Sequence, residues 1–156
     1  MIFATAGAKL FIGSATDTKS TDFVEADFST ESWTEIKEVE SLGSFGDTSE
    51  EVSFTSIGDS RTRRLKGSRS AGAMEIVIGI DYSDAGQLAL IAAEKQKENF
   101  AFKVEFNDAP VAGTPSERIF VAAVGSASEA LDTADNIMKL NASLWVNSNV
   151  VRVDAA

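Results

Sequence analysis

MEIVIGI, residues 74–80, places an apolar side chain at every second position. Because successive side chains of a strand point to opposite faces of a sheet, Met74, Ile76 and Ile78 would share one buried face. The same period of two runs through Phe100–Phe106 and again through Met138–Val146. These three segments therefore predict strands that each bury one face in a core.

Further strands and one helix follow from weaker patterns. Ile119–Val124 is apolar on both faces, which is typical of a strand covered on both sides or of one that meets another subunit. Three shorter patterns predict strands at Lys9–Ile12, Trp33–Val39 and Glu51–Ile57. Residues 83–98 predict the one helix, because Asp84 can cap its start with Gln87 three positions later.

Length and element order favour a single mainly β domain over residues 1–156. The chain has 156 residues, of which 44% are apolar, and this fits one domain. Closely spaced strands with one helix indicate an antiparallel β-sandwich or barrel-like fold with one flanking α-helix. Ser14–Ser32 and Gly58–Gly72 lack periodicity. The second of these segments predicts a long inter-strand loop, and loops of roughly this length are usually functional or disordered.

Opposite charges are segregated along the chain. The formal net charge is -10, from 24 acidic and 14 basic residues, and half of the acidic residues lie between Asp17 and Asp59. Five basic residues follow, with no carboxylate among them: Arg61, Arg63, Arg64, Lys66 and Arg69. The predicted loop Gly58–Gly72 is therefore basic and lies next to an acidic surface.

Three interpretations of this basic loop are open from the residues alone. It is a solvated surface turn, a nucleic-acid contact, or a surface for self-association. Nucleic-acid binding is disfavoured, because the loop has no aromatic residue for base stacking and the rest of the chain would repel a polyanion. Opposite charges on different patches favour head-to-tail contact between copies, which closes into rings or extends into filaments.

Several residue types that carry chemistry are missing. The chain has no histidine, the usual general base near neutral pH, and no cysteine for thiol catalysis or zinc–thiolate sites. No phosphate-binding glycine loop occurs, and Asp81–Asp84 lacks the glycine and distal glutamate of a calcium loop. We therefore expect no enzymatic activity, no catalytic residue, no metal and no cofactor.

Membrane insertion and secretion are not expected either. No apolar stretch approaches the roughly 20 residues of a membrane-spanning helix. The first residues show no basic region followed by an apolar stretch and a cleavage site. We expect synthesis in a cytoplasm and no membrane partner.

A series of short segments follows a recognisable order along the chain. They are Arg61–Gly67, Ala71–Ile76, Asp84, Gly86–Leu90, Phe100–Val104, Asp108–Pro110, Arg118–Ala122, Asn136–Ile137, Leu140–Ala142, Asn147–Ser148 and Val151–Val153. This order resembles that of the tail tube proteins of siphophages related to phage lambda. The resemblance covers about residues 33–153, whereas residues 1–32 fit the family poorly.

The resemblance implies a two-sheet sandwich with a flanking helix, arranged in hexameric rings that stack into a tube. The partners would be other copies of the chain, a tape-measure protein and a tail terminator. DNA would pass through a negatively charged lumen without sequence-specific binding. The location would be the virion tail, after assembly in the host cytoplasm. The basic loop Gly58–Gly72 would reach the adjacent ring through Arg61, Arg63, Arg64, Lys66 and Arg69.

Three apolar residues are candidates for contacts within a ring. Ile119 and Val121 belong to the strand that is apolar on both faces. Trp145 points away from Leu144 and would be partly exposed unless a neighbouring subunit covers it. Two other functions are open from the sequence: an Hcp-like secretion-system tube protein, and a soluble non-enzymatic binding domain.

Overall fold

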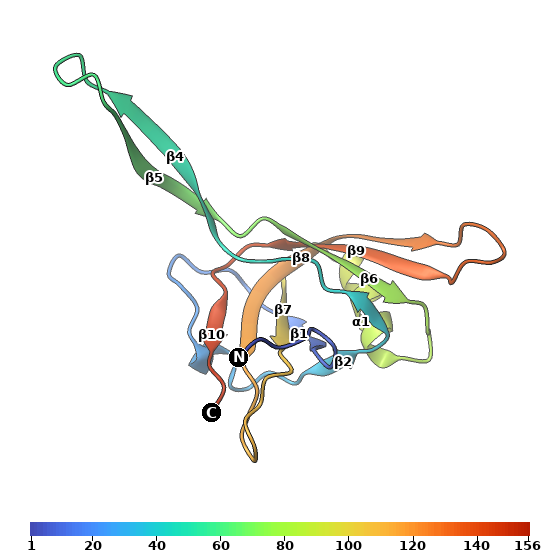
Figure 1. Cartoon of the computed structure of the whole chain (residues 1–156). Helices are drawn as coiled ribbons and strands as arrows, with labels where there is room; N and C mark the ends of the chain where they lie inside the picture. The colour runs from blue at the N-terminus through green and yellow to red at the C-terminus, as the bar shows by residue number, and fades with distance from the viewer.

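The computed structural model describes residues 1–156 and consists of ten strands, one α-helix and one short 3-10 helix (Figure 1). In chain order they are β1 (Lys9–Ala15), η1 (Glu25–Phe28), β2 (Thr34–Ile36), β3 (Val39–Ser41), β4 (Thr48–Thr55), β5 (Thr62–Ser70), β6 (Ala73–Gly79), α1 (Ala85–Glu94), β7 (Phe100–Glu105), β8 (Glu117–Ala130), β9 (Lys139–Val146) and β10 (Val151–Val153). All strand pairs are antiparallel. The predicted mainly β class with a single α-helix is confirmed.

Eight of the strands form one continuous sheet in the order β2-β1-β7-β8-β9-β6-β3, with β10 paired to β8. β8 is the longest strand, at 14 residues, and it joins the two halves of the sheet. Its first half lies between β7 and β10, and its second half pairs with β9. The sheet is not closed into a barrel, and α1 packs on β8, β2 and β1.

The main core lies on the face that the period-two segments predict. Met74, Ile76 and Ile78 of β6 are at most 1% exposed, and alternate residues of β7 and β9 pack with them. Phe102 stacks on Phe120 of β8, with ring centroids 6.0 Å apart. Met138 is the exception, since it is 53% exposed. It was predicted to be buried with β9, but β9 begins only at Lys139, so Met138 lies in the β8–β9 loop.

A second core lies on the opposite face of β7 and β8. The chain between β1 and β2, which the sequence left without periodicity, covers this face with Phe23 and Phe28. The two rings lie 5.4 Å apart, and the Asn149 side chain bonds to both the backbone N and O of Phe23. Ile119 and Val121 are buried beneath them. Of the two explanations for the apolar strand, the structure shows cover by the chain itself.

Helix α1 packs on one face of the open sheet, against β8, β2 and β1. It is shorter than the predicted 83–98, and the Asp84 carboxylate accepts from Gln87 N (3.2 Å) and from Lys37 N (3.0 Å). The buried Gln87 amide donates to Lys37 O and Gly79 O and accepts from Asp81 N. These bonds tie the helix to the β2–β3 connection. No helix of the structure is long and apolar enough to cross a membrane.

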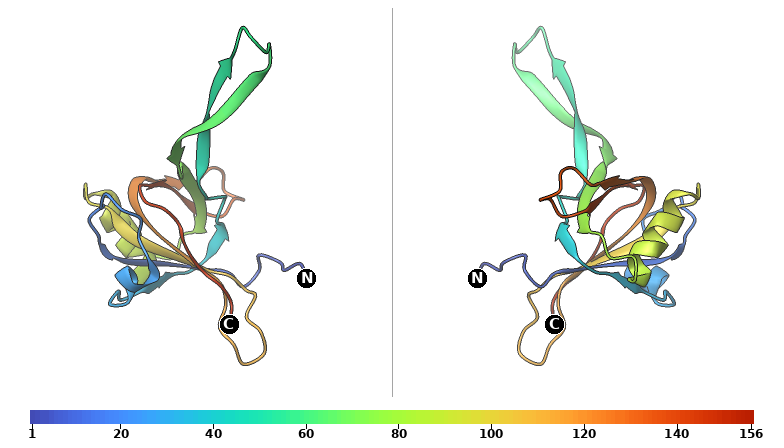
Figure 2. Two further views of the ribbon diagram at one scale, coloured as in Figure 1. Left: turned by 90° about the vertical axis from the view of Figure 1, so that its left-hand side faces the viewer. Right: turned by 90° about the vertical axis from the view of Figure 1, so that its right-hand side faces the viewer.

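The remaining two strands, β4 and β5, form a separate two-stranded hairpin that projects from the body (Figure 2). We call residues 47–70 the arm. The sequence predicted Gly58–Gly72 as a loop without regular structure, and this is wrong for Thr62–Ser70, which is a strand. Alternating hydrophobicity reports burial against a core. The arm has no core beneath it, so β5 lacks that pattern.

Candidate assembly surfaces

The arm is an antiparallel ribbon whose register shifts once, between Ser49 and Glu51. Its register pairs Val52 with Leu65, and Thr55 with Thr62 at the last rung, where the two hydroxyl oxygens are 3.0 Å apart. Ser60 adopts a left-handed conformation (φ 50°), and its N–H donates to Ser56 O to close the turn. The arm therefore has a defined shape in the single chain.

The arm has one apolar face, because directly paired residues of a ribbon share a face. Val52, Phe54 and Leu65 lie on it and are 50%, 61% and 66% exposed. Ile57 at the tip is fully exposed. The opposite face carries polar and charged side chains: Glu51, Ser53, Thr55, Thr62, Arg64 and Lys66. No residue of the same chain covers either face, since all of β4 and nearly all of β5 is exposed.

The five basic residues predicted as inter-ring contacts all lie on the arm, but three of them pair within it. Arg63 pairs with Asp59, Arg64 with Glu51 at 3.1 Å, and Arg69 with Asp47 at 2.7 Å. Arg61 and Lys66 have no carboxylate within ion-pair distance. Glu50 is also without an ion pair, so the arm offers a net charge of +1 to another molecule, from Arg61 and Lys66 against Glu50.

A second hairpin projects from the body where β8 ends and β9 begins. We call residues 129–138 the β8–β9 tip. Three apolar side chains are exposed there, Leu131 at 53%, Ile137 at 72% and Met138 at 53%. Its charged residues are all acidic: Glu129, Asp132 and Asp135. Glu129 lies next to Tyr82, and burial together with this carboxylate raises the pKa of the Tyr82 hydroxyl. The β8–β9 tip is thus apolar and acidic at once.

The predicted ring-contact residues separate into two groups. Ile119 and Val121 are 4% and 0% exposed, because Phe23 and Phe28 of the same chain cover them. They are therefore not available as exposed contacts of the folded chain, which corrects that expectation. Trp145 is 54% exposed and lies over Gly125 of β8. Its role in a ring contact stays a prediction.

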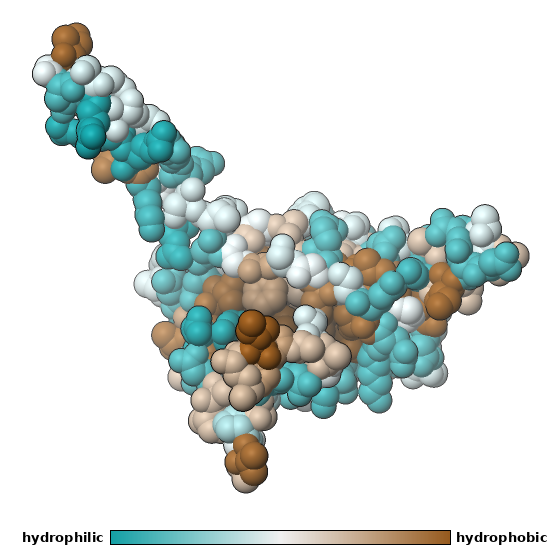
Figure 3. Space-filling view, viewed as in Figure 1, coloured by the Kyte–Doolittle hydropathy of each residue, from teal (hydrophilic) through white to brown (hydrophobic).

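An apolar hollow of about 260 Å³ lies at the mouth of the main core, lined by Phe3, Leu42, Phe45, Val104 and Phe106 among others. Figure 3 shows this face of the molecule, with apolar surface over its middle. Another hollow, of about 420 Å³, lies at the base of the arm and is polar, with Lys19, Asp47, Arg69 and Asn149 in its wall. No group of three or more acidic side chains is placed to hold a metal ion.

Solved structures similar to this chain come from tubular injection particles. A structure of an extracellular contractile injection system, the PVC sheath/tube terminator in its extended state, matches with a TM-score of 0.70 at 11% identity, over 98% of this chain and 97% of that chain. The anti-feeding prophage baseplate, 6-fold symmetrised, matches with a TM-score of 0.71 at 9% identity, over 99% and 97% of the two chains.

The SPP1 tail tube is also similar, with a TM-score of 0.60 at 16% identity, over 94% of this chain and 76% of that chain. No protein-family model matches the sequence, and no curated protein matches it significantly. At these identities the similarity establishes the fold. The resemblance to tail tube proteins is confirmed at that level: this chain has the fold found in the SPP1 tail tube and in contractile injection particles.

Proposed function

We propose that this chain is a structural subunit of a phage tail tube, forming hexameric rings that stack into a hollow conduit. The observation that carries the proposal is the arm, which orders 24 residues outside the core and leaves an apolar face uncovered. An isolated two-stranded hairpin is marginally stable in water. An exposed apolar face on such a hairpin indicates a surface that another molecule covers.

The size of this contact indicates repeated assembly rather than a stable dimer. Complete burial of a Val, Leu or Phe side chain is worth about 1.5–3 kcal/mol. Covering three that are 50% to 66% exposed therefore gives roughly 3–5 kcal/mol per arm. Even before the free-energy cost of association is subtracted, one such contact alone corresponds to a dissociation constant of only about 1 mM. Many copies closed into rings would add such contacts into a stable particle.

The remaining features of the chain fit a conduit for DNA. A net charge of -10 opposes non-specific adhesion to a polyanion, so DNA would slide through the lumen without sequence-specific binding. The further partners we propose are a tape-measure protein inside the tube during assembly and a tail terminator at its end. The location is the virion tail, and assembly takes place in the host cytoplasm. The subunit acts without cofactor or catalysis.

The proposal is tested by negative-stain microscopy and size-exclusion chromatography of the purified chain. We expect rings or hollow tubes. A triple variant of the apolar arm face, Val52→Ser, Phe54→Ser and Leu65→Ser, should stay folded and remain monomeric. The matched control changes the opposite face with Ser53→Ala, Thr55→Ala and Thr62→Ala, and it should still assemble. A wild-type chain that stays monomeric at millimolar concentration would instead support a soluble binding domain.

A tube of a contractile injection particle is the second candidate. Here the observation is length, because the chain covers 88% to 97% of the injection-particle chains but 76% of the SPP1 chain. The two candidates share the subunit and differ in what surrounds it. Neighbouring genes separate them: a sheath gene and a baseplate ATPase gene favour the injection particle, whereas a tape-measure gene and a terminator gene without a sheath gene favour a siphophage tail.

A further inference from the structure

We infer that the apolar face of the arm docks on the β8–β9 tip of a second copy of this chain. The inference rests on the proposed function, and it names the surface that the arm recognises. Both surfaces are projecting hairpins of the molecule, and each presents several exposed apolar side chains that its own chain leaves uncovered. Val52, Phe54 and Leu65 lie on one, and Leu131, Ile137 and Met138 lie on the other.

The two surfaces are opposite in charge. Arg61 and Lys66 are the arm's cations without an ion pair. The tip carries Glu129, Asp132 and Asp135 and no basic residue, and the nearest cation, Lys139, is held by Glu40 at 2.8 Å. The apolar face of the arm is flanked by unpaired cations, Arg61 next to the last rung and Lys66 on the opposite face, and it therefore has an anionic apolar counterpart on the same molecule. Such complementarity steers association and fixes which surfaces meet.

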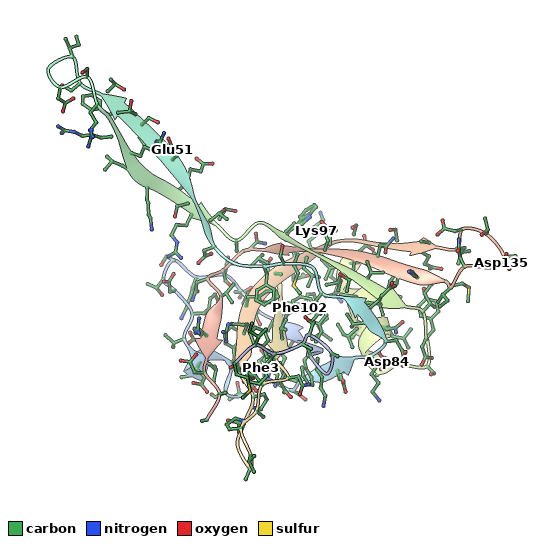
Figure 4. All side chains as sticks on the ribbon, viewed as in Figure 1. Phe3, Glu51, Asp84, Lys97, Phe102 and Asp135 are labelled. Atoms are coloured by element: carbon green, nitrogen blue, oxygen red, sulfur yellow. The ribbon has the colours of Figure 1, made fainter.

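The positions of the two surfaces require a second copy. Figure 4 shows Glu51 on the arm and Asp135 on the tip on opposite sides of the molecule, with the body between them. The arm also points away from the body in every view. A chain cannot satisfy this contact with itself. Since the two surfaces differ, the contact is head-to-tail, and repeated copies close into a ring or extend into a filament.

Other surfaces are less suited to receive the arm. The hollow near Phe3 and Phe45 is apolar, but it lacks a group of free carboxylates, since its one acidic residue, Asp108, is bonded to Ser116. The polar hollow at the base of the arm has few apolar residues in its wall, and its one carboxylate without an ion pair is Asp22, since Lys19 pairs with Asp27 and Arg69 with Asp47. The β8–β9 tip has both exposed apolar side chains and a group of carboxylates.

The absence of cysteine from the chain allows a direct test by disulfide formation between copies. One preparation carries Phe54→Cys on the apolar face of the arm, and the other carries Met138→Cys on the tip. They are mixed as dissociated subunits, assembled and mildly oxidised. A disulfide forms only where two Cα atoms come within about 7 Å of each other. We expect a cross-linked dimer in the mixture and little in either preparation alone.

The control pair replaces the arm residue by its neighbour on the opposite face, Ser53→Cys, and mixes it with Met138→Cys. We expect the Phe54→Cys mixture to cross-link at least about fivefold more than this control, because adjacent strand residues face opposite ways. Equal cross-linking of both pairs would contradict the inference that the apolar face of the arm is the face that docks. No cross-linking in particles that microscopy shows to be tubes would overturn the β8–β9 tip as the acceptor, while the tube proposal would stand.

A charge exchange gives a second test that does not depend on cysteine placement. Arg61→Glu with Lys66→Glu on the arm, or Asp132→Lys with Asp135→Lys on the tip, should each slow assembly at least about tenfold at low salt. The chain that carries all four changes restores opposite charges and should recover most of the rate. Failure of the fourfold variant to recover, with its fold intact by circular dichroism, would overturn the pairing. A wild-type chain that forms no rings or tubes would overturn both proposals.

Discussion

The indole of Trp145 occupies the space that a side chain at residue 125 would fill. A Cβ atom on Gly125 would lie 2.2 Å from Trp145 Cε2, and Gly125 lies where the register between β8 and β9 shifts. The glycine therefore lets a half-exposed aromatic ring lie flat on the sheet. This placement makes Trp145 a fixed part of the surface and not a freely rotating side chain.

Gly125→Ala should move the indole of Trp145 off the sheet. Because the ring is 54% exposed, it can swing into solvent, so we expect a loss of folding stability below about 1.5 kcal/mol. The intrinsic tryptophan fluorescence of Trp145 should shift to longer wavelength, which is measured in a Trp33→Phe background. If this surface contributes to a ring contact, the yield of rings should fall in Gly125→Ala and also in Trp145→Ala. Unchanged ring yield in both variants would remove Trp145 from the interface.

Gln87→Leu should destabilise the whole fold. The Gln87 side chain is fully buried. Without its amide, Lys37 O, Gly79 O and Asp81 N each lose a hydrogen-bond partner. An unpaired buried backbone group costs about 1–3 kcal/mol, so we expect a loss of roughly 2–4 kcal/mol in a urea titration. Leu88→Gln, one position along on the exposed side of α1, is the control and should stay within about 0.5 kcal/mol of wild type.

Replacing Arg61, Arg63 and Arg64 together by Ala should weaken stacking without unfolding the body. The arm shares no core with the sheet, and the pairs of Arg63 and Arg64 lie within the arm on exposed side chains. Exposed pairs contribute little to folding. We expect the thermal midpoint of the body to change by less than about 3 °C and tube yield to fall. An unchanged tube yield would mean that these cations take no part in assembly.

Salt should slow the assembly of the wild-type chain. The Debye length is about 10 Å at 0.1 M and about 3 Å at 1 M ionic strength, so exposed charges on the arm and the tip attract one another less as salt rises. Turbidity or light scattering should show a longer lag at higher sodium chloride concentration. An identical lag across the series would mean that apolar contacts alone set the rate.

Acid should loosen the connection between β7 and β8 through Asp108. Its carboxylate accepts from Ser116 Oγ (2.6 Å) and Ser116 N (2.8 Å), and these bonds hold the pKa of Asp108 below its ordinary value of 3.8. Because the pKa is lower in the folded chain, the contribution is present above pH 3.8 and is lost as pH falls through the folded value.

The test compares thermal melts of wild type and Asp108→Asn from pH 5 down to pH 2.5. The amide can keep the contact with Ser116 but does not titrate, so the variant should lose less stability than wild type over the acidic part of this range. The same sign applies to Asp27, whose pKa is lowered chiefly by its bond with Lys19. Parallel curves for the two proteins would exclude Asp108 as a source of the acid sensitivity.

The elements that pack against the main core were predictable from the sequence. Met74, Ile76 and Ile78 alternate because each second residue of β6 is buried, and Asp84 caps α1 as its spacing with Gln87 indicates. The cover over the second face was not predictable. Phe23 and Phe28 lie in irregular chain around a single short 3-10 turn, and irregular chain has no period to detect.

The same limit explains the errors in the candidate surfaces. An apolar pattern at Ile119 and Val121 shows that something covers the strand, but it does not distinguish the chain's own residues from a neighbour's. The basic residues were correctly gathered in one projecting segment, whereas its strand structure and the contribution of Leu65 to its apolar face were missed. Charged residues on both sides of Leu65 hide that face in the sequence, since Arg63 and Arg64 precede it and Lys66 follows it.

The arm is joined to the body only at its two ends, and this has an evolutionary consequence. Substitutions between residues 48 and 70 leave the buried side chains of the sheet untouched, so they escape the selection that preserves folding. The recognition between copies that we propose for the arm can then diverge quickly while the body stays the same. Under that proposal, two related particles assembling in one cell would keep their subunits apart in this way, each arm accepting only its own kind.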